Sequence, residues 1–314
     1  MKEFIITEND EGRRMDKYVM NILRGAGPSF TYKMLRKKNI VLNDGRAGGK
    51  ELLKSGDSIK IYLSDETFEK FSEKNDTGIA ADHPMPPIVY EDDDMMIVNK
   101  PAGMLTQKAG AKDVSLNEIC LSYIKAQDPE AYRNSQFTPS VCNRLDRNTS
   151  GLVTFAKTYR AARCLSEGFS DKTLHKIYKC IAVGVIKEDM DLTGVLVKDA
   201  ATNTVTISDK GDGAYIETIV HPITNNGKLT IAEVSPLTGR THQIRAHMAY
   251  AHFPLLGDNK YGDTSVNDIY RKKYGIKSQI LVCTAISFPD GFEIAAVAGK
   301  TFEIAFPEEY MQVM

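Results

Sequence analysis

The chain has 314 residues, of which 42% are hydrophobic and 26% are charged, proportions typical of a globular protein with a sizeable core. No stretch approaches the roughly 18 apolar residues that a membrane-spanning helix needs, and the N-terminal residues do not form a signal peptide. The five cysteines include no C-x-x-C pair, which indicates reduced thiols, argues against a zinc site and leads us to expect a cytoplasmic protein.

The net charge of −1 conceals an uneven distribution along the chain. Residues 1–62 contain 13 Lys and Arg against 8 Asp and Glu, whereas residues 63–94 contain 2 against 10. A basic segment attracts nucleic acid because its cations neutralise phosphates. The pattern predicts three parts: a basic domain at 1–63, an acidic, proline-ended linker at 64–87 and a large domain at 88–314.

The first domain is predicted to contain two helices and a small sheet. Apolar residues recur at helical spacing between positions 15 and 23, and Ser29 is the expected N-cap of a second helix. The Asn43-Asp44-Gly45 turn after a short apolar run predicts a β-hairpin, and alternation at 58–62 predicts another strand.

Basic residues share one face of the second predicted helix, and such a face alone is usually ordinary solvated surface. The order of elements nevertheless resembles the small RNA-binding module first described in ribosomal small-subunit protein four. The residues that carry this resemblance are Arg14–Tyr18, Lys33–Asn39, Ile40–Gly45 and Gly56-Asp57. The resemblance implies contacts with RNA phosphates, which add affinity without reading bases, by Lys33, Arg36, Lys37 and Lys38.

The large domain begins with two predicted strands, 88–90 and 95–98, on either side of Glu91–Asp94. The acidic run invites a metal site, but adjacent side chains at a hairpin turn do not converge easily on one ion, so we expect a turn. Pro101 should hold Lys100 in an extended segment, where its ammonium can be directed at a ligand.

Strands outnumber helices in the remainder of the large domain, which predicts an α+β fold. Ser115 and Thr158 are expected to start helices, the latter with Ala162, Leu165 and Phe169 facing inward. Further strands are predicted at 176–183 and between 194 and 234, and residues 281–306 are expected to supply closing strands.

The stretch from Asn143 to Gly151 places Asp146 between Arg144 and Arg147, just before a tight turn and an apolar strand. A carboxylate near apolar surface needs partners in order to stay ionised. Taken alone, this arrangement favours a structural ion pair that closes a loop, rather than a reacting group, because ion-pair networks also perturb carboxylates.

Two other stretches offer candidate site residues. Tyr178 falls on the strand face opposite Ile177 and Ile181, where its ring could stack on a base or simply pack under a loop. Thr241 is the expected N-cap of a helix that carries Arg245. The five-residue separation of the two histidines on this helix, His242 and His247, is unsuited to a zinc pair.

Four stretches together resemble the RluA-type family of pseudouridine synthases. They are 93–103, 144–152, 176–178, and 238–248 followed by Gly257-Asp258 and Tyr261-Gly262. The resemblance implies an enzyme that isomerises uridine in RNA to pseudouridine without a metal or an organic cofactor. It also implies a mixed, mainly antiparallel central sheet with flanking helices, preceded by a small α/β RNA-binding module.

By this resemblance the essential aspartate of the family falls on Asp146, its base-stacking tyrosine on Tyr178 and its conserved arginine on Arg245. A cation such as Arg245 must face a carboxylate that stays ionised where water is excluded. The residues expected to hold the RNA backbone are Arg144, Arg147, Lys100 and Arg240.

Two positions depart from the family pattern, because Asn143 and Thr284 stand where histidine is usual. We expect a monomer that modifies large-subunit ribosomal RNA. The sequence leaves open transfer RNA as the substrate, and a non-catalytic role in RNA binding or ribosome assembly. A glycosidase is disfavoured because no second carboxylate is placed to act as an acid.

Overall fold

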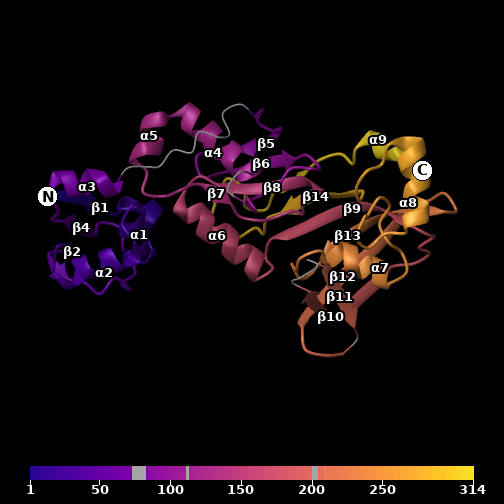
Figure 1. The fold of residues 1–314 in the computed structure, drawn as a ribbon, viewed down its shortest axis with the longest axis horizontal. Helices are drawn as coiled ribbons and strands as arrows, with labels where there is room; N and C mark the ends of the chain where they lie inside the picture. The colour runs from indigo at the N-terminus through magenta and orange to yellow at the C-terminus, as the bar shows by residue number, and fades with distance from the viewer. Residues whose placement is uncertain (73–82, 111–112, 200–203, 209) are drawn as a thin grey trace.

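The computed structural model describes residues 1–72, 83–110, 113–199, 204–208 and 210–314. The molecule is elongated, with the N-terminus and the C-terminus at opposite ends (Figure 1). A small N-terminal unit, which we call the front module, lies beside the helices α5 and α6 of a larger unit built on one sheet (Figure 1).

The front module has a four-stranded antiparallel sheet with the order β1-β4-β2-β3. Asn43 and Asp44 both have positive φ, 49° and 60°, which is the turn type that the Asn-Asp-Gly sequence favours, so the predicted hairpin is confirmed. The regular elements are β1 (Lys2–Ile5), the 3-10 turn η1 (Glu8–Asp10), α1 (Met15–Ile22), α2 (Pro28–Arg36), β2 (Ile40–Leu42), β3 (Gly45–Arg46) and β4 (Ser58–Ile61).

The predicted N-cap at Ser29 is wrong, because α2 begins at Pro28 and its N-cap is Gly27, two residues earlier than predicted. Proline suits the first helical position, where its fixed φ fits the helix and its missing N–H is not needed. Thr31, Met34 and Leu35 form the buried side of this helix, while Lys33, Arg36 and Lys37 are exposed.

A third helix, α3 (Asp65–Ser72), lies inside the segment predicted to be a linker. Phe68 and Phe71 pack against the core of the front module, and the Gly25 amide donates to the Phe71 carbonyl at 2.9 Å. Only two aromatic residues mark the buried side of this acidic helix, so the sequence shows little periodicity. Its packing extends the front module to Ser72.

The large unit is built on an 11-stranded sheet. The main path is β11-β10-β12-β13-β9-β14-β8-β6-β5, and β7 and β15 pair at its sides; the pairing of β14 with β8 is parallel and the others are antiparallel. The strands are β5 (Ile88–Glu91), β6 (Met95–Lys100), β7 (Ser140–Val141), β8 (Ser150–Ala156), β9 (His175–Val183), β10 (Met190–Asp199), β11 (Thr204–Ser208), β12 (Ala214–Asn225), β13 (Leu229–Pro236), β14 (Leu281–Ser287) and β15 (Thr301–Glu303).

Helices flank this sheet, and the predicted starts of two of them are confirmed. Ser115 and Thr158 are the N-caps of α4 and α6, and the Thr158 side chain accepts a hydrogen bond from the Ala161 amide. The buried side of α6 is Ala161, Cys164, Leu165 and Gly168, so the predicted inward set was only partly right. The helices are α4 (Leu116–Gln127), α5 (Pro129–Asn134), α6 (Tyr159–Ser170), α7 (Gln243–Tyr250), α8 (Thr264–Tyr274) and α9 (Glu308–Met311).

The sequence predicted that residues 281–306 supply closing strands, but strand β14 lies in the middle of the sheet, between β9 and β8. It places Cys283 beside Tyr178 on one side and beside Gly151 on the other. Gly151 has a φ of +111°, and a Cβ at this position would lie 2.2 Å from the Cys283 carbonyl oxygen. Residues 142–149 form the loop that carries Asp146, which we call the Asp146 loop. Strand β8 follows this loop and is fixed, through β14, to strand β9, which carries Tyr178.

The front module meets the large unit through a buried arginine. The Arg13 guanidinium lies 5.1 Å from the ring centroid of Tyr18 and 5.2 Å from that of Tyr159 at the start of α6. Nearby, Asn21 Nδ2 donates to the Gln136 carbonyl at 3.2 Å. Such cation–π contacts are strongest where water is excluded, and Arg13 is only 3% exposed.

None of the helices in the described ranges combines the length and the apolar character required to cross a membrane.

Candidate active site

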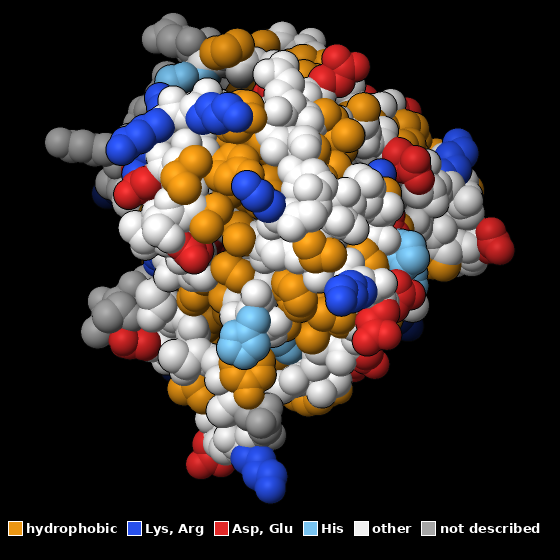
Figure 2. Space-filling model, turned by 90° about the vertical axis from the view of Figure 1, so that its right-hand side faces the viewer, with side chains coloured by type: hydrophobic (Ala, Val, Ile, Leu, Met, Phe, Trp, Pro, Cys, Tyr) orange, Lys and Arg blue, Asp and Glu red, His pale blue; other side chains and the backbone are white. Residues whose placement is uncertain are grey.

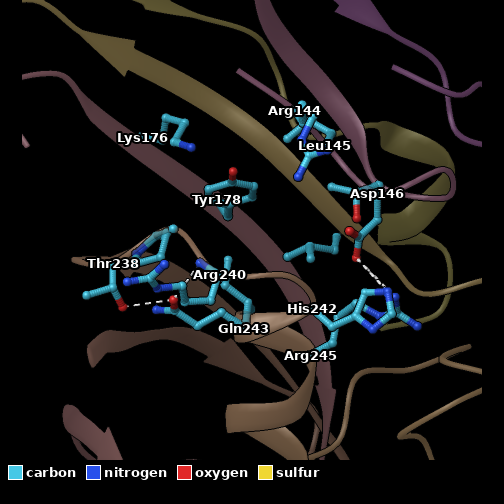
Figure 3. A pocket seen from close by; sticks show the side chains of 15 residues that line it. Arg144, Leu145, Asp146, Lys176, Tyr178, Thr238, Arg240, His242, Gln243 and Arg245 are labelled. Atoms are coloured by element: carbon cyan, nitrogen blue, oxygen red, sulfur yellow. Dashed lines mark hydrogen bonds and ion pairs between the residues drawn. The ribbon is translucent and has the colours of Figure 1, made fainter. Parts of the chain in front are cut away.

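An inner pocket of about 100 Å³ lies where the Asp146 loop, strand β9 and the segment before α7 meet. Its walls include Asp146, Lys176, Tyr178, Arg240, His242 and Arg245, and Figure 3 shows these side chains around one opening. The pocket shares Arg144, Asp146, Lys176 and Arg240 with an outer groove of about 760 Å³, which also contains Arg147. Segments about a hundred residues apart in sequence thus supply one site.

The backbone on both sides of Asp146 is held by buried polar side chains. Thr106 Oγ1 donates to the Leu145 carbonyl at 2.8 Å and accepts from the Leu145 amide at 3.1 Å. Lys100 Nζ donates to the Arg147 carbonyl at 3.1 Å, and the Thr149 amide donates to the Asp146 carbonyl at 3.1 Å. These contacts leave little freedom for the Asp146 carboxylate, whose side chain is 27% exposed.

Arg245 joins Asp146 to a second, fully buried carboxylate. Its Nη1 donates to Asp146 Oδ2 at 3.0 Å, while Nε and Nη2 donate to the two oxygens of Asp258 at 2.7 and 2.9 Å. Burial opposes charge on Asp258, but Arg245 and the amides of Lys260 and Tyr261 outweigh it and lower the pKa of Asp258. The pair fixes the guanidinium so that one edge faces Asp146.

His242 is a member of the site that the sequence did not predict. Its Nε2 lies 3.9 Å from Asp146 Oδ2, and its Nδ1 lies 2.9 Å from the Tyr261 hydroxyl. The Val205 amide donates to that hydroxyl at 2.8 Å. Burial lowers the pKa of His242, so the ring is neutral at physiological pH, with its Nε2 edge toward Asp146.

Tyr178 and Lys176 project from the same face of β9 into the pocket (Figure 3). Tyr178 is 6% exposed and belongs to the main core cluster, while Ile181 belongs to another cluster, which confirms their predicted opposite faces. Burial raises the pKa of Tyr178 well above its ordinary value, so its phenol stays neutral at physiological pH.

Apart from Lys100, the other predicted site residues fall into two groups. Arg144 and Arg240 line both cavities and Arg147 lines the outer groove; all three are exposed. Lys33, Arg36 and Lys37 lie on the exposed side of α2 in the front module, and neither cavity includes them.

The prediction that Lys100 holds the RNA backbone is contradicted by its position. The side chain is fully buried, and its ammonium donates to the carbonyls of Pro101, Met104 and Arg147 at 2.8 to 3.1 Å. Burial lowers the pKa of Lys100 to about 7, and three carbonyl acceptors match the three N–H groups of the charged form. Lys100 therefore supports the Asp146 loop from within the protein.

The predicted N-cap of α7 at Thr241 is wrong, because His242 occupies that position with a left-handed φ of 55°. The preceding turn is held instead by Gln243, whose Oε1 accepts from Thr238 Oγ1 and the Arg240 amide at 2.8 and 3.0 Å. This conformation of His242 directs its ring toward Asp146 (Figure 3).

The two positions that depart from the family pattern are both buried and structural. Asn143 Oδ1 accepts from the Thr154 amide at 2.7 Å and from its hydroxyl at 3.0 Å, which ties the start of the loop to β8. Thr284 lies at the irregularity in the pairing of β14 with β9 and donates to the Ile177 carbonyl at 3.4 Å. Neither side chain lines the inner pocket.

The acidic run at 91–94 is a hairpin turn, as expected. Asp92 accepts from the Asp94 and Met95 amides, Asp94 pairs with Arg160 at 2.5 Å, and Glu91 pairs with Lys157 at 2.6 Å. Over the described ranges, no group of three His, Cys, Asp or Glu side chains is arranged to hold a metal ion.

Comparison with known proteins places this geometry in a family. The model of the RNA pseudouridylate synthase family matches residues 94–250. The ribosomal large subunit pseudouridine synthase C of Vibrio vulnificus is 30% identical over 307 residues, covering 95% of this chain and 93% of the relative. That of Haemophilus influenzae is 31% identical over 297 residues, covering 92% and 87%. The chain therefore belongs to the RNA pseudouridylate synthase family, which confirms the predicted isomerase activity on uridine in RNA.

Solved structures agree at the level of the fold. Human RNA pseudouridylate synthase domain containing 4 superposes with a TM-score of 0.56 at 19% identity, covering 71% of this chain and 90% of that one. Human RNA pseudouridylate synthase domain containing 1 gives a TM-score of 0.51 at 21% identity, covering 70% and 82%. The predicted α+β fold with a mainly antiparallel sheet is confirmed.

Proposed function

We propose that this chain converts uridine to pseudouridine in large-subunit ribosomal RNA, with Asp146 as the reacting carboxylate. The observation that carries the assignment of Asp146 is its convergence with Arg245 and Tyr178 in the inner pocket from three distant stretches of the chain. The two relatives described above are named as large-subunit enzymes, and they match this chain over nearly its whole length, which supports the choice of RNA.

The orientation of the Asp146 carboxylate suits this role. Arg245 donates to Oδ2 and the Nε2 edge of His242 faces the same oxygen, so both partners lie on one side of the carboxylate. Oδ1 has no such partner among the described side chains and is the oxygen available to the ribose. It acts either as a nucleophile at C1′ or as a base toward a ribose proton, and both roles need an ionised carboxylate.

Tyr178 supplies a flat, neutral surface for the base of a nucleotide that has left its stack. Stacking of one base on an aromatic side chain contributes roughly 1–3 kcal/mol. The target base must be turned out of the RNA to reach Asp146, and the exposed Arg144, Arg147 and Arg240 around the outer groove are placed to bind the displaced backbone.

The front module is proposed to be an RNA-binding unit of the type found in ribosomal small-subunit protein four, separate from the catalytic unit. Its exposed Lys33, Arg36 and Lys37 are free of ion pairs with the described carboxylates. At the other end of the molecule, Figure 2 shows Lys and Arg side chains interspersed with acidic, hydrophobic and neutral surface. The shared exposed side of Lys33, Arg36 and Lys37, without ion pairs to described carboxylates, favours the front module as the part that adds affinity for RNA. The proposed enzyme acts in the cytoplasm as a monomer, without a metal or a cofactor.

Incubation of the protein with unmodified large-subunit RNA, small-subunit RNA and transfer RNA, followed by pseudouridine mapping, tests the proposal. We expect modification of specific uridines in large-subunit RNA and none with Asp146→Asn, which retains the shape of the side chain. Product from Asp146→Asn at the wild-type rate would refute the role of Asp146. Product confined to transfer RNA would change the assigned substrate to transfer RNA. Binding of RNA without any product would favour a binding or assembly role.

A further inference from the structure

Lys176 is a cation in the wall of the inner pocket, and the proposed function described above assigns it no role. It lies two residues before Tyr178 on β9, so both side chains leave the same face of the strand. Figure 3 shows the two next to each other, on the opposite side of the opening from Arg245. Lys176 thus lies beside the position that a base stacked on Tyr178 would occupy.

The surroundings of Lys176 leave its charge uncompensated. Its Nζ lies 5.2 Å from the ring centroid of Phe169 on α6, and the described part of the chain offers it neither an ion pair nor a hydrogen bond. The side chain is half-buried, and this burial lowers the pKa of Lys176. An ammonium in this position gains free energy when negative charge develops next to it, because little water or carboxylate already balances it.

The isomerisation develops such a charge at the base. When the N1–C1′ bond breaks, its electron pair stays on N1, and the detached uracil is an anion whose charge spreads to O2 and O4. This holds whether Asp146 bonds to C1′ or removes a ribose proton. The base then turns and C5 bonds to C1′, while either the bond from Asp146 to C1′ breaks or the proton that Asp146 removed returns to the ribose. The C5 proton is lost and N1 gains a proton, so that the product is an isomer of the substrate.

We propose that Lys176 is a further catalytic residue, whose ammonium stabilises the detached uracil anion held on Tyr178. The inference rests on the proposed function, since it needs the base in the inner pocket. Arg144 and Arg240 line the same pocket but are exposed, which suits phosphates, whereas Lys176 is the more enclosed cation beside the ring. Preorganised charges in enclosed sites act mainly on the transition state rather than on substrate binding.

Single-turnover kinetics on a short RNA that contains the mapped uridine separate this role from RNA binding. With protein in excess, we expect Lys176→Met to lower the rate about 10²-fold while the Kd for the RNA changes less than twofold. Lys176→Arg, which keeps the charge, should recover part of the rate. Lys179→Met is the matched control, because Lys179 lies on the opposite face of the same strand and lines neither cavity.

A rate for Lys176→Met within twofold of the wild type would overturn the inference. So would a loss of rate that disappears at higher protein concentration, because it would place Lys176 in contact with the RNA backbone. Thermal unfolding of each variant shows whether the fold is intact, and Lys176→Gln, which retains a polar tip, replaces the Met variant if that variant unfolds. Failure of the proposed function gives a different result, because the wild-type protein would then make no product.

Discussion

At the scale of single residues, Asp258 determines how Arg245 meets Asp146. It is fully buried and binds two nitrogens of the guanidinium. We predict that Asp258→Asn lowers the single-turnover rate by about 10- to 100-fold, as loss of an outer partner does in other charged sites. Asp268→Asn is the matched control, because that exposed carboxylate pairs with Arg271 on the surface of α8. A rate unchanged by Asp258→Asn would show that Asp146 alone orients Arg245.

The same variant has a predictable effect on stability. Because the pKa of Asp258 is lowered in the folded state, its contribution to the free energy of unfolding is present above its unfolded pKa of about 3.9 and is lost as pH falls through the folded value. The destabilisation caused by Asp258→Asn should be full at pH 6 and should shrink below about pH 4. Urea unfolding of both proteins across this range measures it, and a difference that is constant with pH would contradict it.

Sequence patterns identified the reacting groups better than the groups that support them. Asp146, Tyr178 and Arg245 were predicted together and do line one pocket. The role of His242 depends on Tyr261 and Val205, and the burial of Lys100 depends on carbonyls from the Asp146 loop. These are tertiary contacts between residues far apart in the sequence, so a local sequence pattern cannot predict them.

At the scale of elements, the parallel pairing of β8 with β14 carries the site. We predict that Gly151→Ala costs about 3 kcal/mol or more of unfolding free energy, because its Cβ would meet the Cys283 backbone at a positive φ. Gly227→Ala is the matched control, since Gly227 also has a positive φ but an open surrounding. Equal destabilisation of the two variants by urea unfolding would attribute the effect to φ alone.

The elements themselves were largely predictable, but their neighbours in the sheet were not. A nearly continuous apolar run marks β14 as a buried strand whether it lies at an edge or in the middle. Its central place arises from the pairing of residues more than a hundred positions apart, at Cys283 with Tyr178 and with Gly151. Helix α3 was missed for a related reason, because its two aromatic side chains are partly buried only by their contact with the core of the front module.

At the scale of the whole molecule, an exposed group of three basic residues lies at each end. The front module lies at one end and α8 at the other (Figure 1). The exposed cations Lys33, Arg36 and Lys37 belong to the first end, while Arg271, Lys272 and Lys273 belong to the last turn of α8. The two triplets therefore allow position to be tested at constant charge.

We predict that replacing Lys33, Arg36 and Lys37 together by Ala weakens binding of long ribosomal RNA and makes it less dependent on salt. Each phosphate contact removed should reduce the slope of log K against log salt by about 0.7 to 0.9. The single-turnover rate at saturating protein should stay near that of the wild type, because these residues lie outside both cavities. Replacing Arg271, Lys272 and Lys273 by Ala removes the same charge and should leave the salt slope unchanged. Equal slopes for the two triple variants would mean that net charge, rather than the front module, directs RNA to the site.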